Sequence, residues 1–176
     1  ASWIDAGKGL SGLQIHEIYF DGVTAGTLFA ACCPGIYKCS GGGARWTNLT
    51  PAGGRVMDVM AAAVHPKNPA ILYAAIQTLG LRKSMDGGTT WRTLGPITDR
   101  VGDLAIDPAR NDRIFAVSYD KGIYRSLNGG TSWTRVGPAD MTSGGWATVL
   151  SLDVDRFHPA TVWAGTTDGR VWRSMG

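Results

Sequence analysis

The chain has 176 residues, the length of one domain with a substantial core, and its 25 glycines and 18% charged residues indicate a folded chain with many turns. Its net charge of +3 comes from 17 basic and 14 acidic residues that are scattered singly, so no basic stripe is available to bind nucleic acid. The apolar runs are far shorter than the roughly 18 residues that a membrane helix needs, and we expect no membrane insertion.

Four similar units follow one another, each with four expected strands. The first strand of each unit is an apolar stretch, at residues 15–20, 59–64, 101–106 and 149–154. The second places small residues after an aromatic, at residues 27–31, 71–75, 113–117 and 161–165. The third begins near a glycine, at residues 35–38, 80–83, 122–125 and 170–173, and the fourth begins at a tryptophan. Glycine and β-branched residues interrupt every window that could form a helix.

The spacing of the units identifies the architecture. Trp3, Trp46, Trp91 and Trp133 are 43, 45 and 42 residues apart, a period typical of a four-stranded propeller blade. We therefore predict an all-β chain, a β-propeller built of four-stranded antiparallel blades, with four blades in a single domain over residues 1–176. The repeats run approximately over residues 3–45, 46–90, 91–132 and 133–176, with residues 1–3 closing the last blade.

The ring can be completed in three ways, all of which the sequence leaves open. Residues 1–3 and 174–176 look like the two halves of one interrupted turn. One chain could close as a four-bladed ring, two chains could exchange edge strands as an eight-bladed homodimer through their terminal blades, or the segment could belong to a larger ring. Some closure is expected, because bare strand edges and apolar blade faces need a partner.

The turn between the third and fourth strands has a recurring composition. Ser84 and Asp86 can hydrogen-bond the backbone of their own turn. Glycines such as Gly88 supply positive φ values, and Trp91 buries a large ring. The structural residues predicted for these turns are Ser84, Asp86, Gly88, Thr90, Trp91, Ser126, Asn128, Gly130 and Trp133. Asn128 replaces the acid in the third unit, where its amide oxygen can still accept a hydrogen bond.

The pattern SxDxGxTW, present as SMDGGTTW at residues 84–91 and as SLNGGTSW at residues 126–133, resembles the Asp-box or BNR repeat. That family includes sialidases, xyloglucan-degrading glycoside hydrolases, sortilin-type receptors and a photosystem II assembly factor, all of them β-propellers. Through its period the resemblance covers essentially the whole chain. It implies the propeller fold and an extracellular or periplasmic location, but it leaves the function open.

The first unit departs from the pattern. Cys39 stands in place of the serine and Gly41 in place of the acid, so this turn should be the loosest. Cys39 also lies close in sequence to Cys32 and Cys33, with a spacing that matches neither a zinc pair nor a spread disulfide framework. We interpret all three as small buried residues. A single bridge from Cys39 to Cys32 or Cys33 stays open for an exported chain.

Binding residues are expected in the loops around the mouth of the channel. The candidates are Trp146, Arg55, Arg100, Tyr119, Asp120 and Lys121. Trp146 stands in a glycine-rich loop, where an exposed aromatic would suit stacking on a sugar. Covering the channel or a blade edge would explain Trp146 equally well. The partners that these residue types suggest are protein or carbohydrate.

Glu17 and Asp103 occupy the same repeat position in alternate units. In a four-bladed ring they would face each other across the axis, as the paired carboxylates of a glycoside hydrolase do. The competing interpretation is that each carboxylate pairs with a nearby arginine or contacts water in the channel. They are the only catalytic candidates that the pattern offers.

Other site chemistry has little support. The three histidines fall at different repeat positions, so we expect no metal site, and no motif indicates a cofactor. A serine or cysteine nucleophile has no identifiable base. The sequence lacks the Arg-Ile-Pro motif of sialidases, which argues against sialidase-like chemistry. The xyloglucan-degrading members need two propellers to form their cleft, and one short ring lacks that cleft.

Three functions follow from these observations. The favoured one is a non-catalytic binding or assembly module that presents channel-mouth loops to a glycan or protein partner. The second is a glycoside hydrolase, or a fragment of one, that uses the channel carboxylates. The third is a structural propeller fragment that assembles by strand exchange.

Overall fold

The computed structural model describes residues 2–50, 58–95, 97, 100–137 and 148–175. These residues form four antiparallel sheets, in each of which the strands pair in chain order. Within the same ranges there is no helix that could cross a membrane.

Each sheet corresponds to one predicted unit. The first contains β1 (Gln14–Phe20), β2 (Leu28–Cys33), β3 (Gly35–Cys39) and β4 (Trp46–Asn48). The second contains β5 (Val59–Val64), β6 (Leu72–Ile76), β7 (Gly80–Ser84) and β8 (Arg92–Thr93). The third contains β9 (Val101–Ile106), β10 (Ile114–Ser118), β11 (Gly122–Ser126) and β12 (Thr134–Arg135), and the fourth contains β13 (Val149–Val154), β14 (Thr161–Thr166) and β15 (Val171–Met175). The first, second and third strands begin and end within two residues of their predicted positions.

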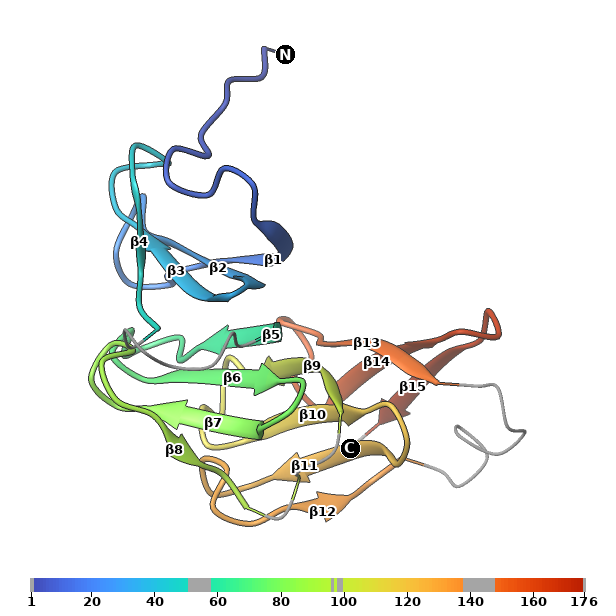
Figure 1. Cartoon of the computed structure of the whole chain (residues 1–176). Helices are drawn as coiled ribbons and strands as arrows, with labels where there is room; N and C mark the ends of the chain where they lie inside the picture. Colours follow the sequence, from blue (N-terminus) through green and yellow to red (C-terminus); the bar gives the residue numbers. More distant parts are fainter. Residues whose placement is uncertain (1, 51–57, 96, 98–99, 138–147, 176) are drawn as a thin grey trace.

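The sheets stand next to one another as the blades of a propeller (Figure 1). Consecutive blades touch through their first strands, β1 with β5, β5 with β9 and β9 with β13. This position explains why apolar residues occur on both faces of the first strands, since both faces of a strand between neighbouring blades are covered. Val59 and Ala61, adjacent to a register shift in β5, are both buried.

The hydrophobic core lies between the blades. At each junction an aromatic side chain from the second strand of one blade lies in a core cluster with an apolar side chain from the first strand of the next. The three pairs are Phe29 with Ala62, Tyr73 with Leu104, and Phe115 with Leu152. Alanines flank these aromatics on the second strands, which lets neighbouring blades approach closely.

The turn between β7 and β8 has the hydrogen bonds that its sequence predicts. The Ser84 hydroxyl donates to Asp86 Oδ1 and accepts from the Gly88 N–H, both at a distance of 2.8 Å. Asp86 accepts from the N–H of Thr90 at 2.9 Å and from its hydroxyl at 2.6 Å. The Trp91 indole N–H donates to the Gly88 carbonyl at 2.9 Å. Side chains therefore hold both ends of the turn together.

The turn between β11 and β12 repeats this arrangement with an amide in place of the acid. Asn128 Oδ1 accepts from the Ser126 hydroxyl at 3.0 Å and from the Ser132 N–H at 2.8 Å. The Trp133 indole N–H donates to the Gly130 carbonyl at 3.0 Å. In the first blade the Cys39 thiol reaches only the Ser40 carbonyl, at 3.5 Å, as the loss of serine and acid predicts.

A second contact locks each blade to the one before it. In each turn between third and fourth strands, the glycine three residues before the tryptophan leaves room for an apolar side chain that follows the fourth strand of the preceding blade. A Cβ atom added to that glycine would lie within 3.0 Å of this side chain. The pairs are Leu49 with Gly88, Leu94 with Gly130, and Ala6 with Gly43. Ala6 thus occupies the place that follows a fourth strand, one blade ahead of the first.

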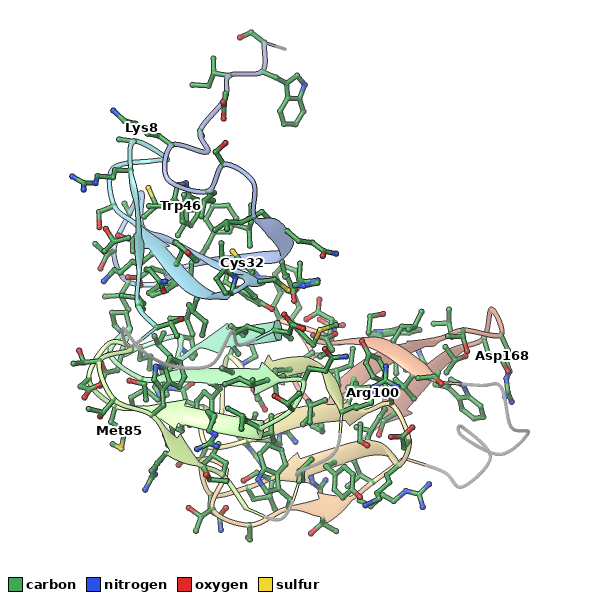
Figure 2. The ribbon with its side chains drawn as sticks, in the orientation of Figure 1. Lys8, Cys32, Trp46, Met85, Arg100 and Asp168 are labelled. Carbon is green, nitrogen blue, oxygen red and sulfur yellow. The ribbon has the colours of Figure 1, made fainter. Side chains whose placement is uncertain are left out.

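The predicted closure of the last blade is not realised within this one chain. In the described residues the fourth sheet has three strands, and Trp3 is 95% exposed and outside any strand. The N-terminal segment lies against the first blade, where the main-chain N–H of Trp46 donates to the Lys8 carbonyl at 3.1 Å. Figure 2 labels both residues in the upper part of the view. The strands β4, β8 and β12 pair with the third strands of their own sheets.

A candidate site in the cavity between the inner strands

The first strands of all four blades line one cavity of 680 Å³. Its walls are mostly apolar, and its polar lining residues are Glu17, Tyr19, Asp103, Ser151 and Asp153. The structure therefore brings the two carboxylates that the sequence singled out, from alternate blades, into the same space.

Asp103 links the third blade to the fourth. Its side chain is 9% exposed. Oδ1 accepts a hydrogen bond from the N–H of Leu104 at 2.7 Å, and Oδ2 accepts one from the N–H of Leu152 on β13, also at 2.7 Å. The expected partner Arg100 instead lies over the ring of Tyr119. Asp103 therefore satisfies a main-chain donor on the next inner strand.

Glu17 takes part in the corresponding link between the first two blades. Its carboxylate accepts a hydrogen bond from the Tyr19 hydroxyl. That hydroxyl oxygen accepts in turn from the N–H of Ala62 on β5, at 2.7 Å. The other expected arginine partner, Arg55, lies outside the described residues. In alternate blades, then, a polar side chain of one inner strand binds an amide of the next.

Burial raises the pKa of Asp103 to about 6, and the charges of Glu17 and Asp153 add to the rise, while the two amide hydrogen bonds oppose it. Burial also raises the pKa of Glu17, against the effect of the Tyr19 hydrogen bond and with a contribution from Asp153. For Tyr19, burial and the Glu17 charge raise the pKa, so its hydroxyl keeps its proton and donates at neutral pH.

This geometry restricts what the carboxylates can do. A general acid or nucleophile needs a carboxyl oxygen that reaches the substrate. Both oxygens of Asp103 already accept main-chain hydrogen bonds, and the side chain is buried. Glu17 is exposed but is bonded to Tyr19. Across the described ranges, no group of three or more histidine, cysteine, aspartate or glutamate side chains could hold a metal ion.

Four of the six predicted binding residues gather at one end of the third blade, where β9 begins and β10 turns into β11. The Tyr119 N–H donates to the Arg100 carbonyl at 2.9 Å, and the Arg100 guanidinium lies 5.4 Å from the centre of the Tyr119 ring. The ring occupies space that Gly102 leaves free, since a Cβ there would lie 2.3 Å from it. We call Arg100, Tyr119, Asp120 and Lys121 the rim cluster.

Two members of the rim cluster lie in a single turn. Asp120 and Lys121 are exposed in the β10–β11 turn, where the Lys121 N–H donates to Ser118 Oγ at 3.2 Å. Arg55 and Trp146 lie outside the described residues. Arg100 is labelled in Figure 2, among the lower blades and away from Lys8 of the N-terminal segment.

The structure also shows groups that sequence reasoning missed. Tyr19 and Asp153 share one repeat position, two residues after that of Glu17, and this register could have identified them. His16 Nε2 lies 3.2 Å from Cys33 Sγ, which corrects the expectation that a cysteine has no base nearby. Burial, and then Asp58, raise the pKa of Cys33 to about 11, so the contact leaves the thiol protonated.

All three cysteines are free in the structure. Cys32 and Cys39 are buried in the first blade, as small apolar residues would be, and Cys33 is half-buried. Burial raises the pKa of Cys32 to about 11.

The fold and the inner cavity define this chain as a series of propeller blades. No family model matches the sequence, and no curated protein matches it. Solved structures do match. An ancestral GH74 enzyme has 23% identity and a TM-score of 0.76, over 92% of this chain and 23% of that one. The GH74 enzyme of Niastella koreensis has 20% identity and a TM-score of 0.74, over 91% and 28%.

A third similar structure is YCF48 from Cyanidioschyzon merolae, with 17% identity and a TM-score of 0.68, over 91% of this chain and 50% of that one. The chain thus spans about a quarter of the length of the two GH74 enzymes and half of YCF48. At these identities the likeness shows the fold, a β-propeller of four-stranded antiparallel blades, and the chain is a propeller module.

Proposed function

We propose that this chain is a non-catalytic propeller module that binds a carbohydrate chain at the rim cluster. The observation that carries the proposal is the bonding of Asp103, whose two oxygens both accept main-chain hydrogen bonds between blades. A carboxylate used in this way supports the fold and is not available for glycoside cleavage. The proposal includes the assignment of the β7–β8 and β11–β12 turns as Asp boxes and an extracellular or periplasmic location.

The rim cluster has the chemistry that a sugar surface requires. Tyr119 offers part of a flat ring whose position is set by Gly102 and Arg100. Exposed Asp120 and Lys121 stand beside that ring and can hydrogen-bond hydroxyl groups. An aromatic face bordered by polar groups suits a ligand with both apolar C–H faces and polar edges.

The test is a panel of soluble polysaccharides, including xyloglucan, measured by calorimetry for binding and by reducing-end release for cleavage. The wild-type chain should bind at least one polysaccharide and release no reducing ends. Tyr119→Ala should weaken binding about tenfold or more, while Met85→Ala, at an exposed residue on another blade, should leave it unchanged. Absence of binding to every polysaccharide overturns the carbohydrate proposal and leaves a protein partner to be sought.

A glycoside hydrolase is the second candidate, because Glu17 and Asp103 line one cavity and burial raises the pKa of both. This function predicts that the wild-type chain releases reducing ends and that Glu17→Gln or Asp103→Asn abolishes the release. Turnover of that kind would replace the binding-module proposal. Full turnover in both variants would exclude these carboxylates as catalytic residues.

A further inference from the structure

The turn between β3 and β4 carries a cation where the turn of the next blade carries an acid and a hydroxyl. In the second blade Asp86 accepts hydrogen bonds from Thr90 within its own turn. At the same two repeat positions the first blade has Gly41 and Arg45. The loss of the acid in the first blade is thus accompanied by the gain of a guanidinium group on the same turn.

Arg45 lines a cavity of 420 Å³ on the outer strands of the first blade. The other described lining residues are Lys38 on β3, Ser40 directly after it, Thr47 on β4 and Leu49 directly after that strand. Lys38 pairs with Thr47 across the two strands, and the lining residues alternate along both, so their side chains share one face of the hairpin. Two cations and two hydroxyls therefore line one space, and none of the described lining residues is acidic.

The next blade junction shows which partners the fold can supply to a lysine at this position. Lys83 holds the repeat position of Lys38, is 8% exposed, and donates from its amine to the Gly129 carbonyl of the third blade at 3.1 Å. Burial lowers the pKa of Lys83 and the charge of Arg92 adds to this effect, while the charge of Asp112 on the third blade opposes it. The following blade thus supplies both a carbonyl and a negative charge to this cation.

The second blade has an alanine where the third blade supplies that charge. The N–H groups of Gly87 and Gly129 donate to the carbonyls of Ala70 and Asp112, at 2.8 and 2.9 Å, so Ala70 holds the place of Asp112. A Cβ atom added to Gly129 would lie 3.2 Å from the lysine amine of the preceding blade, whereas one added to Gly87 would meet nothing within 4 Å. The lysine of the first blade therefore does not reach the turn of the second.

The two cations of the first blade lack a carboxylate partner in the described part of the chain. The Lys38 amine lies 5.5 Å from the centre of the Phe29 ring, and Arg45 is exposed. Among the residues that the structure describes, neither side chain forms an ion pair. An oxyanion would accept charge-assisted hydrogen bonds from both cations, and the hydroxyls of Ser40 and Thr47 can donate to its remaining oxygens.

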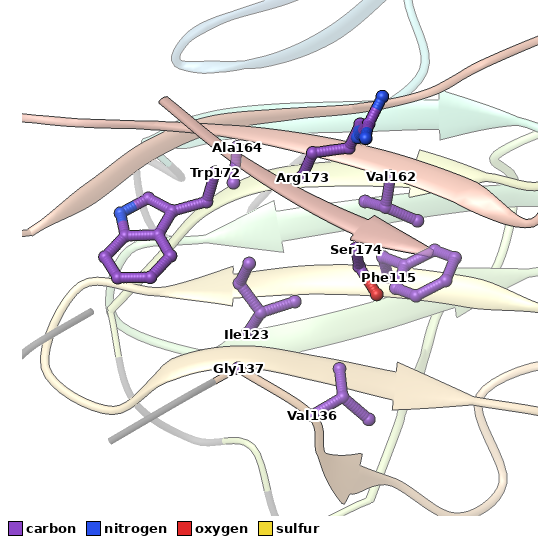
Figure 3. Close-up of a pocket in the computed structure, with 9 residues that line it drawn as sticks. All are labelled: Phe115, Ile123, Val136, Gly137, Val162, Ala164, Trp172, Arg173 and Ser174. Atoms are coloured by element: carbon purple, nitrogen blue, oxygen red, sulfur yellow. The ribbon is translucent and has the colours of Figure 1, made fainter. Parts of the chain in front are cut away.

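The cavity at the junction of the third and fourth blades has a different lining. Val136 holds the repeat position of Leu49 and lines a cavity of 220 Å³ there, together with Phe115 and other apolar side chains (Figure 3). The guanidinium of Arg173, which also lines it, lies 5.5 Å from the centre of the Trp163 ring. At this junction one cation thus stands against an apolar surface, whereas the first blade brings two cations to a polar one.

We propose that the cavity on the first blade binds the sulfate or phosphate ester group of a small sugar. The ester group lies between Lys38 and Arg45 and supplies the negative charge that Asp112 supplies at the next junction. The volume of 420 Å³ suits a small molecule, and Leu49 offers an apolar contact to the sugar ring. The site lies on the first blade, apart from the rim cluster on the third, so it does not depend on the proposed function.

Calorimetry tests the site with glucose esterified at its primary hydroxyl with sulfate or with phosphate, beside inorganic sulfate, inorganic phosphate and unmodified glucose. At least one ester should bind, and more tightly than glucose. Arg45→Ala and Lys38→Met should each raise its dissociation constant about tenfold or more, since each removes a charge-assisted hydrogen bond. Arg92→Ala removes an exposed cation from the second blade and is the matched control, which should leave the constant unchanged.

A further variant restores the acid that the second blade lacks. Ala70→Asp places a carboxylate at the repeat position of Asp112 and should weaken ester binding, because it neutralises Lys38 from within the chain. Thermal unfolding checks that each variant is folded. The ester that binds more tightly identifies the preferred group, and equal binding identifies the oxyanion that both share. Binding of neither ester, binding of the inorganic ions alone, or ester binding that Arg45→Ala and Lys38→Met leave unchanged overturns the proposal.

Discussion

One side chain at a fixed repeat position closes the first turn of every blade. Asp21, His65, Asp107 and Asp155 each accept hydrogen bonds from the N–H groups two and three residues further on, over 2.8 to 3.2 Å. The second oxygen of Asp107 also accepts from Arg113 Nε at 2.6 Å, and the second oxygen of Asp155 lies 3.3 Å from His158 Nδ1. The shared backbone role thus allows aspartate or histidine at this position, while the partner of the second carboxylate oxygen differs between blades.

Replacing Arg113 tests how much the Asp107–Arg113 ion pair contributes to the free energy of unfolding. Asp107 is fully buried, and Arg113 also donates to the Pro159 carbonyl of the next blade. Arg113→Leu leaves a buried carboxylate without its cation and should lower the free energy of unfolding by about 3 kcal/mol. Urea denaturation measures it, with Arg110→Leu as an exposed control that should stay within about 0.5 kcal/mol. Equal effects of the two variants would contradict the assignment.

The raised pKa of Asp103 gives the chain a pH-dependent stability of predictable sign. Because the folded state holds this proton more tightly than the unfolded chain, the contribution of Asp103 is fully present below about pH 4. It is lost as the pH rises through about 6. Urea denaturation between pH 4 and 7.5 should show a loss of stability that Asp103→Asn flattens and Asp112→Asn, at an exposed carboxylate, does not. A slope that both variants share would contradict it.

At the scale of the strands, neighbouring blades are joined by the contact between the residue after a fourth strand and the turn before the fourth strand of the next blade. Leu94, directly after β8, is buried against Gly130 of the next blade. The glycine is needed for its positive φ of 89° and for the space that the leucine fills. The serine and aspartate of a turn hold it in shape, so that it can receive the preceding blade.

Removing the leucine side chain should separate these effects. Leu94→Ala leaves a cavity at the junction of the second and third blades and should cost about 2 to 4 kcal/mol of unfolding free energy. Met85→Ala, at the tip of the turn between β7 and β8, is the exposed control and should cost little. Thermal and urea unfolding would both report the loss. A cost below that of the control would show that the contact is incidental.

The strands themselves could be predicted from the sequence because the repeat shows each of them four times. Alignment of the units averages out local ambiguity, as in β6, where an aromatic followed directly by an alanine recurs in three other blades. The hydrogen bonds of the Ser84 turn were also accessible, since their donors and acceptors lie within four residues of each other. Hydrogen bonds between residues this close in sequence can be predicted from the sequence alone.

The role of the inner carboxylates could not be predicted. Asp103 bonds the amide of Leu152, 49 residues away, and Tyr19 bonds that of Ala62, 43 residues away. Their spacing in sequence equals about one repeat, but only the packed blades show that a neighbouring main chain, rather than an arginine, is the partner. The His16 contact with Cys33 likewise depends on how β1 lies against β2.

The whole molecule is an open series of blades whose interior is better covered than its ends. The strands β5, β6, β9 and β10 are largely buried, whereas most of β1 is exposed. The turn of the first blade also lacks the serine and acid that hold the second. Unfolding should therefore begin at the two ends and reach the central blades last.

Amide hydrogen exchange tests this order. The strands β1 and β15 should exchange faster than β9 and β10, since their backbone is less covered. Exchange that is uniform along the chain would contradict this order.

The glycine that receives the preceding blade has an evolutionary consequence. The space beside each of these glycines is filled by an aliphatic side chain from the unit before it. The pairs at Gly43, Gly88 and Gly130 differ only in whether alanine or leucine fills the space. Duplicating or deleting a whole unit in the gene would reproduce the same fit at the new boundary. Sequences of this design can therefore change their number of blades in single genetic steps, with no new interface to invent.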